Sequence, residues 1–276
     1  MRLLNTSTLH VESVPYNNLP RYAILSHTWG SDEVSFQQLQ ELNHSQQLRG
    51  PNSTHPIRQS ERFAKIRDSA ALAARSGYEF IWIDTCCIDK SSSTELSEAI
   101  NSMFRYYQEA AICYAYLSDV PGARLRQPTA QETDSETREV IDGETEAAVR
   151  RSRWFTRGWT LQELIAPRDV HFFAMDWTPI GRKLDHRFAL LVHEITGVGM
   201  STLRGSSDLE ELSIATRMRW ASARATTRVE DIAYCLFGIF GINMPLLYGE
   251  GRRAFIRLQE EILKREQIQS FKSLYR

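Results

Sequence analysis

Trp159 and Glu163 stand four positions apart in a segment with helical character. Residues at this spacing share one helix face, so we expect the Trp159 indole to lie against the Glu163 carboxylate and contact the same ligand. A positioned carboxylate can stabilise positive charge that develops in a reaction, or orient a hydroxyl group or a water molecule. Glu163 is therefore a candidate catalytic residue. The alternative is a glutamate near a helix start, where the helix dipole stabilises its charge.

Two further charged residues are candidates for ligand binding. The Arg157 guanidinium could bind a ligand phosphate or form a surface salt bridge with Glu163, and the sequence favours the salt bridge. Asp84 ends an apolar run, where it could bind ribose hydroxyls as acidic residues do in other nucleotide-binding folds. It could equally cap the turn that follows.

The end of the first apolar run and the loop that follows it contain four further candidate binding residues, which are Ser26, His27, Trp29 and Gly30. Their small side chains and backbone N–H groups could hold phosphates, and Trp29 could stack on a base. Gly30 could instead only end the strand while Trp29 covers the core. His27 could act as a general base, although a lone histidine is more often a hydrogen-bonded structural residue.

Continuous apolar runs predict the strands that position these residues. The predicted strands are residues 22–26, 80–84 and 111–117, followed later by 170–173. Apolar positions at helical spacing predict helices over 61–76, from Ser93 or Thr94 onward, and over 189–196. Strands alternating with helices indicate a parallel α/β sheet. Ligands bind such sheets at the carboxyl ends of the strands, where the candidate residues lie.

Composition limits the organisation and the class of partner. The 276 residues are 42% hydrophobic and 24% charged, with a net charge of −1, which provides no general attraction to nucleic acid or anionic membranes. No apolar run is long enough to span a bilayer, so we expect a cytoplasmic protein. We predict one domain over residues 1–205, an acidic surface insertion at about 121–150 and a helical extension over 206–276. Residues 37–60 are polar and read as a loop or weak helix.

The four cysteines, Cys86, Cys87, Cys113 and Cys235, form no CxxC pair. We therefore expect no structural metal site and interpret them as reduced, buried residues. A cysteine hydrolase is disfavoured because no histidine is evidently paired with them. Asp89 and Glu95 are interpreted as residues at a helix start that Ser93 or Thr94 caps.

Five segments together resemble the heterokaryon incompatibility (HET) domain of filamentous fungi. They are residues 22–30, 82–90, 154–164, 227–236 and 243–251, with Glu95 and Met103 between them. The resemblance implies a cell-death effector in non-self recognition that associates with itself or with another incompatibility protein. The sequence contains no GxxxxGK[ST] motif, so it indicates no ATP or GTP switch.

HET domains in turn resemble Toll/interleukin-receptor (TIR) domains. This implies a TIR-like (flavodoxin-like) parallel sheet flanked by helices, with the C-terminal helices as an extension. In the NAD-cleaving TIR domains a glutamate four residues after a tryptophan is catalytic, which matches Glu163. Cleavage of the nicotinamide–ribose bond passes through an oxocarbenium-like state, and its cationic leaving group needs no general acid. NAD is thus the expected substrate and no resident cofactor is expected. The alternative is a non-enzymatic signalling or adaptor module, since TIR-like folds support both functions.

Overall fold

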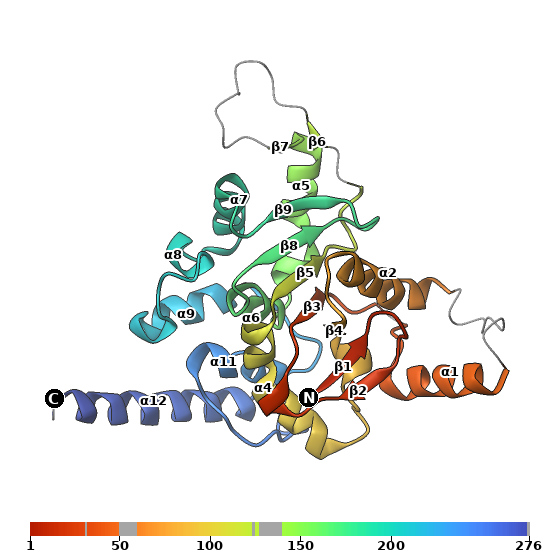
Figure 1. The fold of residues 1–276 in the computed structure, drawn as a ribbon. Coiled ribbons are helices and arrows are strands. Elements are labelled where there is room, and N and C mark those ends of the chain that lie inside the picture. The colour runs from red at the N-terminus through yellow and green to blue at the C-terminus, as the bar shows by residue number, and fades with distance from the viewer. Residues whose placement is uncertain (31, 50–59, 123–124, 127–139, 275–276) are drawn as a thin grey trace.

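A seven-stranded sheet crosses the centre of the molecule in the computed structural model, which describes residues 1–30, 32–49, 60–122, 125–126 and 140–274 (Figure 1). The strands, in their order across the sheet, are β2 (Val11–Ser13), β1 (Arg2–Asn5), β4 (Phe80–Trp82), β3 (Tyr22–His27), β5 (Ile112–Tyr116), β8 (Val170–Phe173) and β9 (Pro179–Arg182). The four central strands are parallel, whereas β1, β2 and β9 run antiparallel to their neighbours. The predicted α/β class with a mostly parallel sheet is confirmed.

Helices flank this sheet and continue beyond it. They are α1 (Phe36–Arg49), α2 (Glu61–Arg75), α3 (Asp84–Cys87), α4 (Ser93–Glu109), α5 (Gly143–Arg151), α6 (Thr160–Ile165), α7 (His186–Thr196), α8 (Met200–Leu203), α9 (Ile214–Ala221), α10 (Asp231–Tyr234), α11 (Phe237–Phe240) and α12 (Arg253–Leu274). Short 3-10 turns are η1 (Tyr16–Asn18), η3 (Arg153–Thr156) and η4 (Leu209–Glu211). A separate ribbon pairs β6 (Leu125–Arg126) with β7 (Val140–Ile141).

The central strands are buried because helices cover the sheet on two sides. Every residue of β3 is buried, as continuous apolar strands require when both faces are covered. In Figure 1, α1 and α2 lie to the right of the sheet, and α4, α6 and the C-terminal helices lie to its left and below. The C-terminal helices reach the sheet layer through α4, where the Asn101 amide donates to Met244 O at 3.3 Å and accepts from Met244 N at 3.2 Å.

Several predicted boundaries need correction. The second strand ends at Trp82 and not at Asp84, because Cys87 N donates to Ile83 O at 2.8 Å and turns the chain into α3. The cap of α4 is Ser92 rather than Ser93 or Thr94, since its hydroxyl accepts from Glu95 N at 3.3 Å.

Helices occur in two polar segments, one predicted as a loop or weak helix and the other as a surface insertion. The polar stretch 37–60 includes most of α1, while residues 50–59 lie outside the described part of the chain. The acidic insertion includes α5, which Asp142 caps by accepting from Thr145 N at 2.7 Å. Residues 123–124 and 127–139 of that insertion also lie outside the described part.

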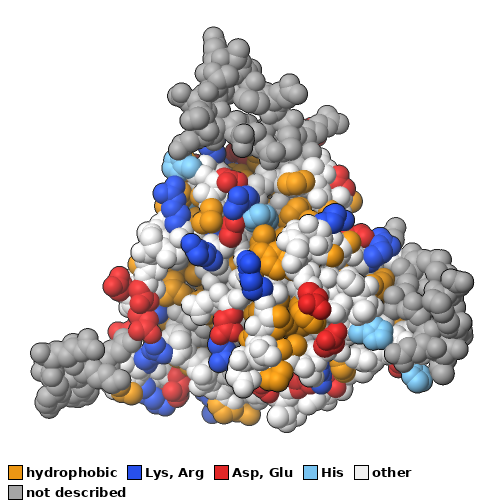
Figure 2. All heavy atoms as spheres, in the orientation of Figure 1, with side chains coloured by type: hydrophobic (Ala, Val, Ile, Leu, Met, Phe, Trp, Pro, Cys, Tyr) orange, Lys and Arg blue, Asp and Glu red, His pale blue; other side chains and the backbone are white. Residues whose placement is uncertain are grey.

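The surface carries charges of both signs. Figure 2 shows acidic and basic side chains interspersed on the face seen there, in keeping with the net charge of −1. Among the described residues, no helix combines the length and apolar character that crossing a membrane requires.

Candidate functional site

Ser26 brings a hydroxyl group into an apolar part of the sheet. It lies near the carboxyl end of β3, paired with Ala115 of the adjacent strand β5, and is fully buried. A buried hydroxyl must find hydrogen-bond partners or lose free energy on folding. Its partners therefore identify the groups gathered at this end of the sheet.

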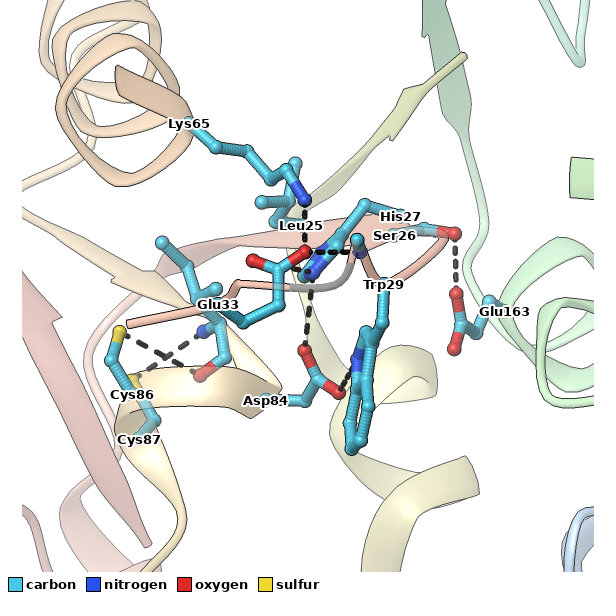
Figure 3. Close-up of polar contacts among 12 residues, drawn as sticks. Leu25, Ser26, His27, Trp29, Glu33, Lys65, Asp84, Cys86, Cys87 and Glu163 are labelled. Carbon is cyan, nitrogen blue, oxygen red and sulfur yellow. Dashed lines mark hydrogen bonds and ion pairs between the residues drawn. The ribbon is translucent and has the colours of Figure 1, made fainter. Parts of the chain in front are cut away.

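A hydrogen-bond chain links Ser26 with two residues that are far away in sequence. The Trp154 indole N–H donates to Ser26 Oγ at 2.9 Å, and Ser26 Oγ donates to Glu163 Oε2 at 2.5 Å. Figure 3 shows Ser26 and Glu163 pointing toward each other. The structure thus joins the predicted catalytic glutamate and one predicted binding residue in one site.

The Glu163 carboxyl lies in an interior environment that resists ionisation. Glu163 is only 8% exposed. Burial raises the pKa of its carboxyl to about 8, and the negative charge of Asp84 contributes to this rise. The hydrogen bond from Ser26, the nearby hydroxyl of Tyr107 and the positive charge of Arg224 act in the opposite direction. A carboxyl with a pKa near neutrality can exist in either protonation state under physiological conditions, as acid–base catalysts often do.

Local contacts fix the short helix α6 that carries Glu163. Thr160, the first residue of α6, donates its hydroxyl to Trp154 O and also contacts Arg157 O at 3.0 Å. At the other end, the buried Lys183 ammonium donates to Leu164 O at 3.1 Å and to Pro167 O. Both ends of the helix are therefore held by buried side chains, which limits the movement of the Glu163 backbone.

A second polar cluster follows directly from β3. Trp29 is 50% exposed and donates its indole N–H to Asp84 Oδ2 at 2.7 Å, while the Lys90 ammonium lies 3.6 Å from its ring centroid. Gly30 N donates to Glu33 Oε1 at 2.7 Å. The predicted residues Trp29, Gly30 and Asp84 are thus close together, and their hydrogen-bonding groups have protein partners.

His27 is buried inside this cluster as a neutral side chain. Burial lowers its pKa to about 3, and the nearby Lys65 adds to the effect. Its Nε2 lies 3.8 Å from Asp84 Oδ1 and 4.0 Å from Glu33 Oε2, which is too far for a hydrogen bond (Figure 3). Neither ring nitrogen has a hydrogen-bond partner among the described residues.

The remaining predicted residues have partners outside the Ser26–Glu163 pair. Arg157 donates from Nη2 to Thr227 Oγ1 at 2.9 Å. Trp159 donates its indole N–H to Asp231 Oδ2 at 3.3 Å. The indole that is hydrogen-bonded to the Ser26–Glu163 pair is Trp154, which is not among the predicted site residues.

The four cysteines are neither paired with each other nor part of a metal-binding cluster in the described part of the chain. Cys86, Cys87, Cys113 and Cys235 are buried and free, as predicted. Burial raises the pKa of the Cys113 thiol and of the Cys235 thiol, the latter to about 12, so the thiolate is disfavoured. No group of three or more potential metal-binding side chains occurs among the described residues.

Two sizeable hollows lie away from this pair. One of about 490 Å³ lies beside β1 and the start of α4, and its lining includes Trp82, Glu95 and Tyr106. The other, of about 480 Å³, is an apolar groove between α9, α10 and α12 with Arg224 in its lining. Glu163 lines neither of them.

The order of motifs and the matching sequence define the class of this protein. The family model described as "Heterokaryon incompatibility protein (HET)" matches residues 22–163, which begin with β3 and end at Glu163. The chain therefore belongs to the heterokaryon incompatibility (HET) family.

One curated relative is similar over most of the chain. The vegetative incompatibility protein HET-E-1 of Podospora anserina is 45% identical over 258 residues, which are 92% of this chain and 17% of that protein. The chain thus spans about one sixth of the length of this relative. No solved structure matches.

Proposed function

We propose that this chain is a cell-death effector of fungal heterokaryon incompatibility and that it acts by cleaving NAD at the Glu163 site. The first part rests on family membership and on the similarity to a vegetative incompatibility protein. The partners in this role would be further copies of the chain or another incompatibility protein.

The single observation that carries the catalytic part is the contact between Ser26 and Glu163. It places a carboxyl of raised pKa near the carboxyl end of a parallel strand. The parallel strands have the spatial order second, first, third, fourth, which is the flavodoxin-like order. In that order ligands bind between the first and third strands, here β3 and β5. A TIR-like fold is therefore part of the proposal.

In the proposed reaction the bond between nicotinamide and ribose breaks, and its electron pair stays on the nicotinamide nitrogen. The ionised Glu163 carboxylate stabilises the oxocarbenium-like charge on the ribose. Water then adds to the ribose carbon, and the products are nicotinamide, ADP-ribose and a proton. Ser26 must exchange its hydrogen bond to Glu163 for one to the substrate, while Trp154 retains the hydroxyl orientation.

The test is NAD consumption by the purified chain at high protein concentration, comparing wild type with Glu163→Gln and Glu163→Ala. We expect turnover by wild type and at least about a hundredfold loss in both variants, since removal of one catalytic group has effects of this size. Unchanged turnover in Glu163→Gln would contradict the proposed role of Glu163. Arg150→Gln is a control on the surface, because the exposed Arg150 side chain pairs with Glu146 at 2.8 Å and with Glu194 at 2.6 Å.

A second candidate function is non-enzymatic signalling by self-association. The observation that favours it is the apolar groove between α9, α10 and α12, beside which Leu263 is 61% exposed. Exposed apolar surface of this kind often marks an association site. Under this alternative, Leu263→Asp would abolish cell death and Glu163→Gln would not, as measured by viability of cells expressing each variant.

A further inference from the structure

The loop that leads into α6 is joined to the C-terminal helical region by backbone hydrogen bonds. Ala225 N donates to Thr156 O at 2.7 Å, and Gly158 N donates to Ala225 O at 2.9 Å. These bonds form an isolated parallel bridge between Arg157 and Ala225. The conformation of residues 156–158, immediately before α6, therefore depends on a segment that follows α9.

The two segments approach so closely that only glycine fits at position 158. A Cβ atom there would lie 2.5 Å from Thr226 Cγ2 and 3.1 Å from Cys235 Sγ. A separation of 2.5 Å does not occur between well-packed carbon atoms, and 3.1 Å is unusually tight. The C-terminal region is thus in direct packing contact with the start of the catalytic helix.

Arg224 adds hydrogen bonds and a positive charge to this contact. It is 8% exposed, and its Nη1 donates to Arg157 O at 2.9 Å and to Thr160 Oγ1 at 2.9 Å. Its Nη2 has no hydrogen-bond partner among the described residues. A buried guanidinium with an unpaired nitrogen is unfavourable unless a nearby negative charge compensates it.

Asp231 forms a second connection to the same loop. Its Oδ2 accepts from the Trp159 indole at 3.3 Å, and its Oδ1 accepts from the Tyr248 hydroxyl at 2.9 Å. Trp159 precedes α6 directly. Arg224 and Asp231 therefore hold the three residues 157, 159 and 160 from the same side.

We propose that the C-terminal helical region completes the Glu163 site, with Arg224 as a positioning residue that fixes α6 and provides a positive charge for the Glu163 carboxylate. This inference rests on the proposed NAD cleavage, but the region lies beyond residues 22–163, the part that the family model covers. Arg224 acts through Thr160 and through its charge and does not itself contact the reacting atoms.

Several groups besides Arg224 act on Glu163. The Ser26 hydroxyl of β3 donates to its carboxylate, and Asp84 of α3 repels its negative charge. The Tyr107 hydroxyl of α4 donates to Leu25 O and lies close to the carboxylate, while the Cys113 thiol of β5 is buried 4.0 Å from Glu163 O. Arg224 attracts the negative charge. Removal of Arg224 therefore leaves the repulsion from Asp84 without this compensation and must make the carboxylate harder to form.

The first measurement is a carbon-13 NMR titration of the Glu163 carboxyl in the full chain, assigned by comparison with Glu163→Gln. We expect the midpoint to rise in Arg224→Met, by less than the shift that burial causes, because Arg224 is the weakest of the groups that act on this carboxyl. Arg217→Met is the matched control and should leave the midpoint unchanged. Arg217 is also a buried arginine of this region, but it contacts Ile239 O at 3.2 Å, the Phe240 ring and Glu266 Oε1 at 4.0 Å.

Arg224→Lys is the second variant in case Arg224→Met does not fold. It retains a positive charge but cannot reproduce the paired donors of a guanidinium, so we expect a smaller shift in the same direction. A Glu163 midpoint equal to that of wild type in every folded Arg224 variant would overturn the proposal.

The second measurement separates this inference from the proposed reaction. If wild type cleaves NAD, its rate should increase with pH as Glu163 ionises. The pH at which the rate is half-maximal should then be higher in Arg224→Met than in wild type, by the same amount as the NMR midpoint. If wild type does not cleave NAD, the proposed function fails, while the NMR titration still decides whether Arg224 acts on Glu163.

Discussion

At the scale of single residues, the protonation of Glu163 connects the site with the stability of the fold. Because burial raises its pKa to about 8 from an ordinary value of 4.5, the protonated form is favoured in the folded state. This favourable contribution is present at low pH and is lost as pH rises toward 8. Glu163→Gln, which cannot ionise, should therefore gain stability relative to wild type as pH increases.

The expected gain of Glu163→Gln between pH 5 and pH 8 is on the order of 3 kcal/mol, since each pKa unit corresponds to about 1.4 kcal/mol. Urea denaturation at several pH values measures it. Any constant cost of the substitution cancels in this comparison. Parallel pH curves for the two proteins would show that Glu163 does not have the raised pKa.

The sequence alone led to only part of this residue network. That Ser26 and Glu163 lie near each other could be predicted, because both belong to motifs of one family. Ligands of parallel α/β sheets bind at the carboxyl ends of the strands, where Ser26 lies. Trp154 lies in the same motif, yet its donation to Ser26 connects positions 128 apart. Sequence spacing cannot predict such a contact, because it depends on how the 3-10 turn η3 packs against β3.

At the scale of elements, α6 depends on the hydroxyl at its first residue. Thr160→Val preserves the shape of the side chain but removes the hydroxyl that donates to Trp154 O, contacts Arg157 O and accepts from Arg224 Nη1. Buried polar groups left without partners cost about 1–3 kcal/mol, so we expect a loss of this size in the free energy of unfolding. Thermal and urea denaturation measure it.

Thr156→Val is the matched control for this helix. Thr156 lies in the same loop and also donates to a carbonyl three residues earlier, Arg153 O at 2.9 Å, but it is exposed. Its substitution should change stability by less than about 0.5 kcal/mol, because water replaces the lost partner. Equal effects of the two substitutions would contradict the importance of Thr160.

The predictability of the elements follows their burial. The apolar strands β3, β5 and β8 were found within one residue because burial on both faces requires continuous apolar runs. The outer strands β1, β2 and β9 were missed. They are only three or four residues long and include polar or proline residues, so their pairing partner, and not their composition, makes them strands.

At the scale of the whole molecule, the C-terminal helices are attached to the sheet layer at a tight contact between α11 and α4. A Cβ atom on Gly238 would lie 2.0 Å from Phe104 Cβ. Gly238→Ala should therefore force α11 away from α4 and reduce stability by about 1–3 kcal/mol, as overpacking of cores does. Denaturation with urea measures the loss.

The control for this packing is Gly143→Ala, at the first residue of α5. No atom lies within 4 Å of a Cβ atom there, so we expect no loss and a slight gain from the better helix propensity of alanine. A similar loss in both variants would indicate a general effect of replacing glycine. Contacts such as this one, between helices 134 positions apart, could not be predicted because the sequence indicates helices but not which surfaces meet.

The burial of all four cysteines makes thiol labelling a measure of how often the folded chain opens locally. A thiol reagent can modify them only during transient openings. At high reagent concentration the rate of alkylation equals the opening rate, and at low concentration it is proportional to the open population. Cys113, beside α6, and Cys86, in α3, lie in different elements. Mass spectrometry of their separate labelling rates therefore compares how often the chain opens around α6 and around α3. A ligand bound near Glu163 should slow the labelling of Cys113 more than that of Cys86.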